Sequence, residues 1–268
     1  MHVITVRYVV MKVISIILTF VLVRSDADLM WIPILDIIGS LIAIVLVFYK
    51  LYKRKILIAW TSLLSVFHKI KDSAVYFASD MATSAFTALN TLLLGIYCSA
   101  PGVADWSICM QLIGAAQSLY TPVINAIYPE MVKTKRISIV KRTAKIFAPI
   151  VSLGCVFTLV VAEYALLIVS GEQYTSAAPL LRSLTPVLFF GFFAMLFGWP
   201  TLGAIGRVRE NSVTTIFSAL FQILGLVLLI VIGQFKLLNI ALLRSLTETL
   251  LFLSRYLIYR KHKNEFCS

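Results

Sequence analysis

The sequence predicts an all-α integral membrane protein with about eight transmembrane helices. Hydrophobic residues make up 60% of the 268 residues and charged residues only 13%. That charged share is about half of what usually keeps the surface of a soluble domain hydrated, and the mean hydropathy is +0.95. The apolar residues also lie in long blocks, each close to the roughly 20 residues that a helix needs to cross a bilayer core. Short polar turns separate these blocks, which excludes the buried core of a soluble protein.

The first half of the chain contains four of these blocks. The first two are predicted to form a hairpin across the polar loop Arg24–Asp28. A mixed stretch follows, basic at its end, and is predicted to be an amphipathic helix at the membrane interface. A turn at Ala100–Gly102 separates the third block from the fourth, and Pro122 and Pro129 bracket the end of the fourth. In chain order, these helices are predicted over residues 3–23, 29–51, 56–71 (interfacial), 73–98 and 106–127.

Four further blocks follow a basic loop between residues 133 and 145. The fifth ends at the turn Ser170–Gln173. The sixth contains Pro186 and Pro200, which interrupt or end it because proline lacks the backbone N–H of a helical hydrogen bond. The last two blocks are predicted to form a hairpin through Gly233–Lys236. These four helices are predicted over residues 146–169, 180–203, 213–232 and 237–259.

The 24 Lys and Arg residues are distributed unevenly between the two predicted sides. Nineteen fall on the side that holds both termini and the loops after the second, fourth and sixth helices. Arg24, Arg182 and Lys236 fall on the other side, and Lys12 and Arg244 fall inside helices. Cytoplasmic loops retain Lys and Arg, so the basic side and the C-terminus are predicted to be cytoplasmic. The net charge of +12 therefore indicates membrane topology and not nucleic-acid binding.

No pattern in the sequence is typical of an enzyme or a metal site. The three histidines lie in loops or near the ends, and the four cysteines do not have metal-ligand spacing. Every predicted outer loop has about ten residues or fewer, whereas a membrane polymerase of glycans is expected to carry a large outer loop. No catalytic residue, cofactor or metal ligand is predicted.

Ionisable residues within helices are the candidates for function, because each costs about 2.5–3.5 kcal/mol near the bilayer centre. Lys12 lies in the first helix, and Asp36 in the second is its natural partner across the hairpin. Arg244 and Glu248 share one face of the last helix at i, i+4. Either this pair neutralises itself and packs against a neighbour, or it is a functional pair. For Lys12 the functional interpretation is a cation that faces a central cavity and holds an anionic group such as a phosphate.

Uncharged polar residues extend this candidate surface into the third and fourth helices. Asn90 is predicted to line a cavity, although interhelical hydrogen bonding explains most residues of this kind in membrane helices. Asp80 and Glu163 also lie in helices, where they have either an interfacial or a functional role.

The stretch from Ser79 to Met131 resembles a known family of membrane proteins. It contains Asn90-Thr91-Leu92-Leu93-Leu94-Gly95, a short turn, and a helix with Ser118-Leu119-Tyr120-Thr121-Pro122 and Ala126-Ile127-Tyr128-Pro129. This resembles the seventh and eighth helices of the lipid-linked oligosaccharide flippases. These form the O-antigen and polysaccharide-exporter branch of the multidrug/oligosaccharidyl-lipid/polysaccharide superfamily. Val103–Trp106 departs from the pattern, because a Gly followed by Tyr is common at that place.

The resemblance implies a fold of about twelve helices in two six-helix lobes around a central cavity. Residues 1–55 then correspond to the last two helices of the N-terminal lobe, 56–72 to a cytoplasmic interfacial linker helix and 73–268 to the six-helix C-terminal lobe. About four N-terminal helices of the family pattern are absent from this sequence.

The function that the resemblance implies is transport of an undecaprenyl-pyrophosphate-linked repeat unit across the bacterial inner membrane, by alternating access and without ATP hydrolysis. For this function, Lys12 and Arg244 are expected to contact the anion, and Asp36 and Glu248 are expected to be their partners or ion-coupling groups. The expected partners are this lipid-linked oligosaccharide, membrane lipids and other polysaccharide assembly proteins, with no nucleic acid. Two alternatives stay open. One is an ion-coupled exporter of small molecules or drugs from the same superfamily, and the other is an inactive truncated membrane protein or a subunit that does not transport.

Overall fold

The computed structural model describes residues 63–267 and scattered positions between 30 and 53. The chain divides into two units, Met1–Val66 and Phe67–Ser268. In the first unit most of the scattered described positions are helical. The helix predicted over residues 3–23, and with it Lys12, lies outside the described residues, as does Asp36. The second unit contains the rest of the structure.

The described residues confirm an all-α membrane protein, because 92% of the structure is helical. Helices α5, α6 with its extension, α7 and α8 are long and apolar enough to cross a membrane. Helices α3 and α4 have 35 residues each, and the apolar stretch described within α3 is Ala88–Tyr97. In chain order the elements are α3 (Leu63–Tyr97), α4 (Ala100–Thr134), α5 (Ile137–Ser170), η2 (Glu172–Ala177), α6 (Ala178–Phe197), η3 (Gly198–Gly203), α7 (Val208–Val231), α8 (Leu237–Lys261) and η4 (Lys263–Glu265).

Three boundaries differ from the prediction. Helix α3 is continuous from Leu63, so no break separates a linker helix from the following span at residue 72. Helix α4 begins at Ala100, with a proline in its first turn where the missing N–H costs nothing. The predicted basic loop is almost entirely helical, and only Lys135 and Arg136 connect α4 to α5. The division of the chain into lobes stays a prediction.

Helix α4 also continues through both of its interior prolines, where the sequence predicted its end. Membrane helices tolerate proline when neighbouring hydroxyl groups satisfy the backbone carbonyls near it. The hydroxyl of Thr121, directly before Pro122, donates to the carbonyl of Gln117 at 2.9 Å, whereas the carbonyl that Pro122 leaves without its helical donor is that of Ser118. The helix reaches Thr134, so its basic end is part of the regular helix.

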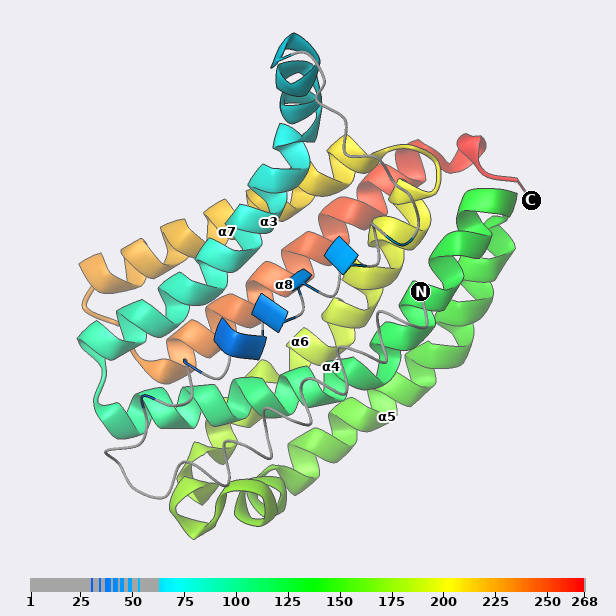
Figure 1. Ribbon diagram of the computed structural model, residues 1–268. Helices are drawn as coiled ribbons and strands as arrows, with labels where there is room; N and C mark the ends of the chain where they lie inside the picture. Colours follow the sequence, from blue (N-terminus) through cyan, green and yellow to red (C-terminus); the bar gives the residue numbers. More distant parts are fainter. Residues whose placement is uncertain are drawn as a thin grey trace. The chain divides into compact units, whose positions relative to one another are not determined.

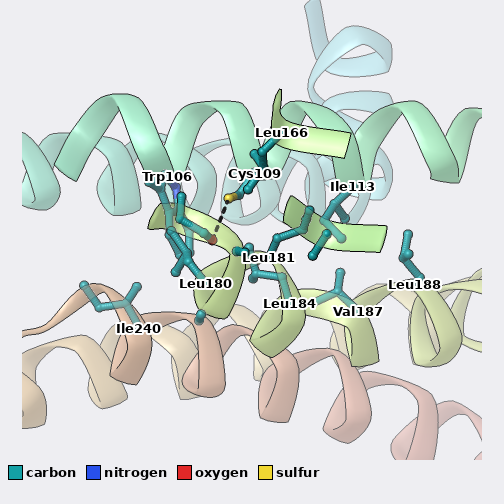
Figure 2. Close-up of a cluster of buried hydrophobic side chains, with 14 of the residues drawn as sticks. Trp106, Cys109, Ile113, Leu166, Leu180, Leu181, Leu184, Val187, Leu188 and Ile240 are labelled. Carbon is teal, nitrogen blue, oxygen red and sulfur yellow. Dashed lines mark hydrogen bonds between the residues drawn. The ribbon is translucent and has the colours of Figure 1, made fainter. Parts of the chain in front are cut away.

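Helix α6 is the central element of the second unit. It packs against α8, α5 and α4, and its apolar stretch is the most enclosed of the candidate membrane spans. Figure 1 shows α6 between α8 on one side and α4 and α5 on the other. A cluster of buried side chains from α4, α5, α6 and α8 fills one part of this junction (Figure 2). Within it, the thiol of Cys109 donates to the carbonyl of Ala177 at 3.8 Å.

A second buried cluster, rich in aromatic rings, fills the other end of the same junction. Phe192 of α6 meets Tyr120 of α4 edge to face, with ring centroids 5.4 Å apart. Phe197 at the end of α6 contacts Tyr259 of α8 at 5.2 Å. Such aromatic pairs contribute about 0.5–1.5 kcal/mol beyond the area they bury, so this end of the bundle is firmly packed.

The C-terminal tail is fastened to this aromatic end. Cys267 pairs with the α4–α5 connection, because its N–H donates to the carbonyl of Lys135 at 2.9 Å and its carbonyl accepts from Ile137 at 3.1 Å. Nη2 of Arg207 lies 2.6 Å from Oε1 of Glu265. Hydrogen bonds from Arg207 and His262 lower the pKa of the Glu265 carboxyl to about 2, so its charge is present and neutralised at neutral pH. The C-terminal tail thus meets the α4–α5 and α6–α7 connections at one end of the helical bundle.

Replacing Gly225 with valine is expected to separate α7 from α8. Even a methyl group at Gly225 would overlap the end of the Leu243 side chain on α8. Overpacking of this kind costs about 1–3 kcal/mol, so thermal unfolding in detergent should begin at a lower temperature. Adding Leu243→Ala should recover most of the loss. As a control, Gly154→Val introduces the same side chain into open space; a Gly225→Val chain as stable as this control would contradict the packing.

Candidate functional site

An ion pair on α8 places two charges inside the helical bundle. Nη1 of Arg244 lies 2.8 Å from Oε2 of Glu248, one turn further along the helix. Both side chains are largely enclosed, with 15% of Arg244 and 10% of Glu248 exposed. The i, i+4 spacing in the sequence therefore brings the two charges together as predicted.

Two polar side chains of α4 approach this pair at Gly191 of α6. A methyl group built on Gly191 would lie 3.0 Å from Nε2 of Gln117, 3.4 Å from the hydroxyl of Tyr120 and 3.5 Å from Oε1 of Glu248. The missing side chain of Gly191 thus allows three polar atoms from two helices to come close together. We refer to Gln117, Tyr120, Arg244 and Glu248 as the interior polar cluster.

Asn90 belongs to a separate buried hydrogen-bond chain that reaches α8 directly beside this cluster. Nε2 of Gln222 on α7 donates to Oδ1 of Asn90 at 3.1 Å. The hydroxyl of Thr247 on α8 donates to Oε1 of Gln222 at 2.6 Å. Thr247 precedes Glu248 in the chain. Asn90 is therefore held by interhelical hydrogen bonding, the ordinary explanation for such residues, and it links α3 to α7 and α8.

Arg255 is a buried charge that the sequence analysis missed, because it was counted with the basic end of the last helix. Only 9% of the residue is exposed. Its Nη1 donates to the carbonyl of Ala194 at 2.6 Å, its Nη2 to the hydroxyl of Thr215 at 2.9 Å and its Nε to that of Thr214 at 3.3 Å. The sequence feature that could have indicated its burial is its spacing. Position 255 follows Glu248 by seven residues and so lies on the same helix face.

Arg255 supports the end of α6, where the helix changes form. Beyond Phe197 the chain continues as the π-helix η3, which contains Pro200. Pro200 cannot donate to the carbonyl of Leu196, and the hydroxyl of Thr201 donates to it instead at 2.8 Å. The predicted interruption of the sixth helix at Pro200 is confirmed, whereas Pro186 lies within regular α6. Short π-helical turns are frequent at functional sites.

Two stripes of polar and small residues lie exposed along α3 and α4, recurring every three or four positions. On α3 the stripe consists of Asp80, Ser84, Ala88, Thr91 and Gly95. On α4 it consists of Gln111, Gly114, Ser118, Pro122, Asn125 and Pro129. By contrast, the exposed residues of α5 between positions 146 and 168 are mainly aliphatic and aromatic. Lipid suits the surface of α5, whereas the two stripes are suited to water, protein or a polar ligand.

Comparison with known proteins decides the family. Residues 1–135, half of the chain, match the family model described as "Polysaccharide biosynthesis protein". The chain belongs to this family. The matched residues include all of α3 and α4, the two helices that carry the polar stripes.

A relative in Shigella dysenteriae, named "Putative O-antigen transporter", is 27% identical over 191 residues. The alignment covers 69% of this chain and 48% of that protein, so the chain spans about half the length of the curated relative it matches. No solved structure matches the chain.

In this member of the polysaccharide biosynthesis protein family, the candidate residues divide into three groups. Arg244 and Glu248 form one ion pair, and Asn90 lies in the adjoining hydrogen-bond chain. Lys12 and Asp36 lie outside the described residues. Glu163 instead pairs with Arg182 at 3.1 Å, where 58% and 39% of the side chains are exposed, so this pair is not part of the interior. Over the described residues, no group of three or more His, Cys, Asp or Glu side chains is suited to a metal ion.

Replacing Gln222 with leucine is expected to weaken the contact of α3 with α7 and α8. The substitution removes the partner of Asn90 Oδ1 and of the Thr247 hydroxyl in a site where Gln222 is fully buried. Each buried polar group left without a partner costs about 1–3 kcal/mol. A lower unfolding temperature in detergent should result. Adding Asn90→Leu to the Gln222→Leu chain should lower this temperature by less than Asn90→Leu lowers it in the wild-type chain. Fully additive effects would contradict a shared hydrogen-bond chain.

Proposed function

We propose that this chain forms part of a transporter that moves a lipid-linked polysaccharide repeat unit across the bacterial inner membrane. Membership of a polysaccharide biosynthesis family and the transporter name of the Shigella relative support this proposal. Four helices long and apolar enough to cross a membrane support a function within the bilayer. The proposal contains no chemical step on the substrate.

The observation that carries the proposal is the polar surface of helices that otherwise belong in lipid. The stripes on α3 and α4 offer hydroxyl, amide and backbone groups, and sugars need such hydrogen-bonding partners when they leave water. The interior polar cluster adds the guanidinium of Arg244, which suits an anionic phosphate. An undecaprenyl-pyrophosphate-linked unit has both features, while its prenyl chain would stay in lipid.

Movement by alternating access, without ATP hydrolysis, is the mechanism that we infer for this transport. The π-helical turn at the end of α6 is a place where that helix can bend, because Pro200 has no backbone hydrogen bond to break. We further propose that residues 73–268 form the six-helix C-terminal lobe and residues 1–55 the last two helices of a preceding lobe. Lys12 and Asp36 would then contribute a second cation and its partner to the cavity.

Restoration of surface polysaccharide in a bacterial cell tests the function. The host would lack its own flippase and retain the enzymes that make the matching lipid-linked repeat unit. Expression of the full-length protein that contains this chain is expected to restore polymer on the cell surface. Normal membrane expression without any surface polymer would contradict the proposal for this chain. Protection from amphipathic cationic drugs, without restored polymer, would instead favour the ion-coupled exporter.

The native cysteine near the C-terminus tests the proposed cytoplasmic orientation of the basic end. Cys267 is exposed, whereas Cys109 is buried and the other two thiols are half-buried. A maleimide that cannot cross membranes should label Cys267 only after the inner membrane is permeabilised. As a control, Gln234→Cys on a Cys267→Ser background should react without permeabilisation, because position 234 lies in the exposed turn at the opposite end of α8. Labelling of Cys267 in intact spheroplasts would mean that the basic end faces the outside of the membrane, which would contradict the proposed orientation.

A further inference from the structure

Six basic side chains gather at the connection between α4 and α5. All six are exposed, and they are Lys133, Lys135, Arg136, Lys141, Arg142 and Lys145. The connection is only two residues long, so the last turn of α4 and the first turns of α5 present their charges together. We refer to these six residues as the α4–α5 basic patch.

The charges of the patch are not balanced by nearby acidic groups. Glu130 is the one acidic residue between positions 130 and 145. In the part of the chain that the structure describes, none of the six bases forms an ion pair with a carboxylate. Glu265, on the tail that pairs with Lys135, is already engaged by Arg207 and His262.

The patch also does not serve the stability of α5. Helix N-termini favour acidic residues because the helix dipole is positive there. The first turn of α5 has no acidic residue, and Lys141, Arg142 and Lys145 follow within its first three turns. The dipole and the side chains therefore add up to one positive surface that is suited to an external anion.

The height of the patch on α5 matches the headgroup level of a bilayer. A helix of 34 residues is about 50 Å long, whereas the hydrocarbon core is about 30 Å thick. About 20 residues counted back from Ser170 reach the neighbourhood of Ile150, and the exposed apolar residues of α5 begin one turn earlier, at Ile146. Lys145 is then about one and a half turns above the hydrocarbon and Lys141 about one turn higher.

Charge and apolar surface are continuous on one face of α5. Lys145 is followed at helical spacing by the exposed residues Pro149, Val156 and Val160. Leu153 and Phe157 lie on the adjoining part of this face and are 71% and 63% exposed. A free phosphate would use only the charged part, whereas a phospholipid with an anionic headgroup uses both parts.

We propose that the α4–α5 basic patch binds an anionic phospholipid, with the headgroup phosphate on Lys141, Arg142 and Lys145 and the acyl chains along the apolar face of α5. This site is independent of the polysaccharide substrate and of the interior polar cluster. Lipids with a zwitterionic headgroup have the same acyl chains without the net charge, so they should bind much more weakly.

Native mass spectrometry of the purified 268-residue chain tests this site. The probes are dioleoyl-phosphatidylglycerol and dioleoyl-phosphatidylcholine added at equal concentration from detergent. The wild-type chain should retain phosphatidylglycerol at least about tenfold more strongly, since one basic residue near an anionic surface contributes about fivefold in affinity. Equal retention of the two lipids would overturn the proposal.

Variants locate the site within the chain. Combining Lys141→Gln, Arg142→Gln and Lys145→Gln should abolish the preference for phosphatidylglycerol, whereas Lys141→Arg with Lys145→Arg should keep it. A control that removes three exposed charges elsewhere, Lys53→Gln with Arg209→Gln and Lys236→Gln, should keep it as well. A triple patch variant that retains the wild-type preference would overturn the assignment. Displacement of the lipid by free glycerol phosphate at equal concentration would indicate a site for soluble anions and would also overturn it.

Discussion

Replacing Arg255 with methionine is expected to lower the stability of the chain by about 2–4 kcal/mol, the largest effect of any single substitution considered. The guanidinium donates to the Ala194 carbonyl and to two threonine hydroxyls inside the bundle. Hydrogen bonds that involve a charged group contribute about 1.5–3 kcal/mol each, and the removal of the charge from a buried place offsets part of their loss. The end of α6 should then lose its connection to α7 and α8.

The midpoint of thermal unfolding in detergent measures this loss. Arg255→Lys should recover little, because a single ammonium group cannot donate to three acceptors in the planar geometry of a guanidinium. Arg209→Gln is the matched control, since it removes an exposed arginine near the start of α7. An Arg255→Met chain that unfolds at the temperature of this control would show that Arg255 does not hold α6 in place.

Exchanging the charges of the α8 ion pair is expected to separate stability from transport. Glu248→Leu alone leaves Arg244 largely enclosed without its carboxylate, which should reduce folded protein in the membrane. Arg244→Glu combined with Glu248→Arg restores a pair, in the order that suits the helix dipole better. Folded protein should therefore return to nearly the wild-type amount.

Transport should not return with it. In the proposed function the cation at position 244 meets the substrate phosphate, and the exchange moves that cation by four residues, about 6 Å along the helix. Surface polysaccharide, measured per folded protein in the flippase-deficient host, should fall more than about tenfold in the exchanged chain. Wild-type transport by the exchanged chain would mean that the pair only neutralises itself.

Local spacing explains which parts of the site could be predicted from the sequence. Arg244 and Glu248 are one helical turn apart, so their contact follows from helix geometry alone. The partner of Asn90 could not be found in this way, because Gln222 lies 132 residues further along the chain. Only the packing of α3 against α7 brings the two amides together.

The charge distribution predicts a topology, which the labelling of Cys267 would test, but it is a poor guide to single residues. Arg255 was counted with the bases of the cytoplasmic side because Arg260 and Lys261 follow it closely, and only its register with Glu248 indicates that it is buried. From residue 73 on, the predicted helix blocks correspond to described helices, but their predicted ends were not correct. Hydropathy falls where a helix leaves the hydrocarbon, whereas α4 and α5 continue for several turns beyond that point.

Photo-crosslinking of the lipid-linked repeat unit tests most directly whether the substrate meets the polar interior of the bundle. The photoreactive residue p-benzoylphenylalanine would replace Gln117, beside Glu248, in one chain and Val160, which is 69% exposed on the apolar face of α5, in another. Both chains would be irradiated in cells that make a radiolabelled repeat unit. The proposed function predicts a labelled adduct at position 117 and little at position 160. Equal labelling at both positions, or labelling only at position 160, would contradict it.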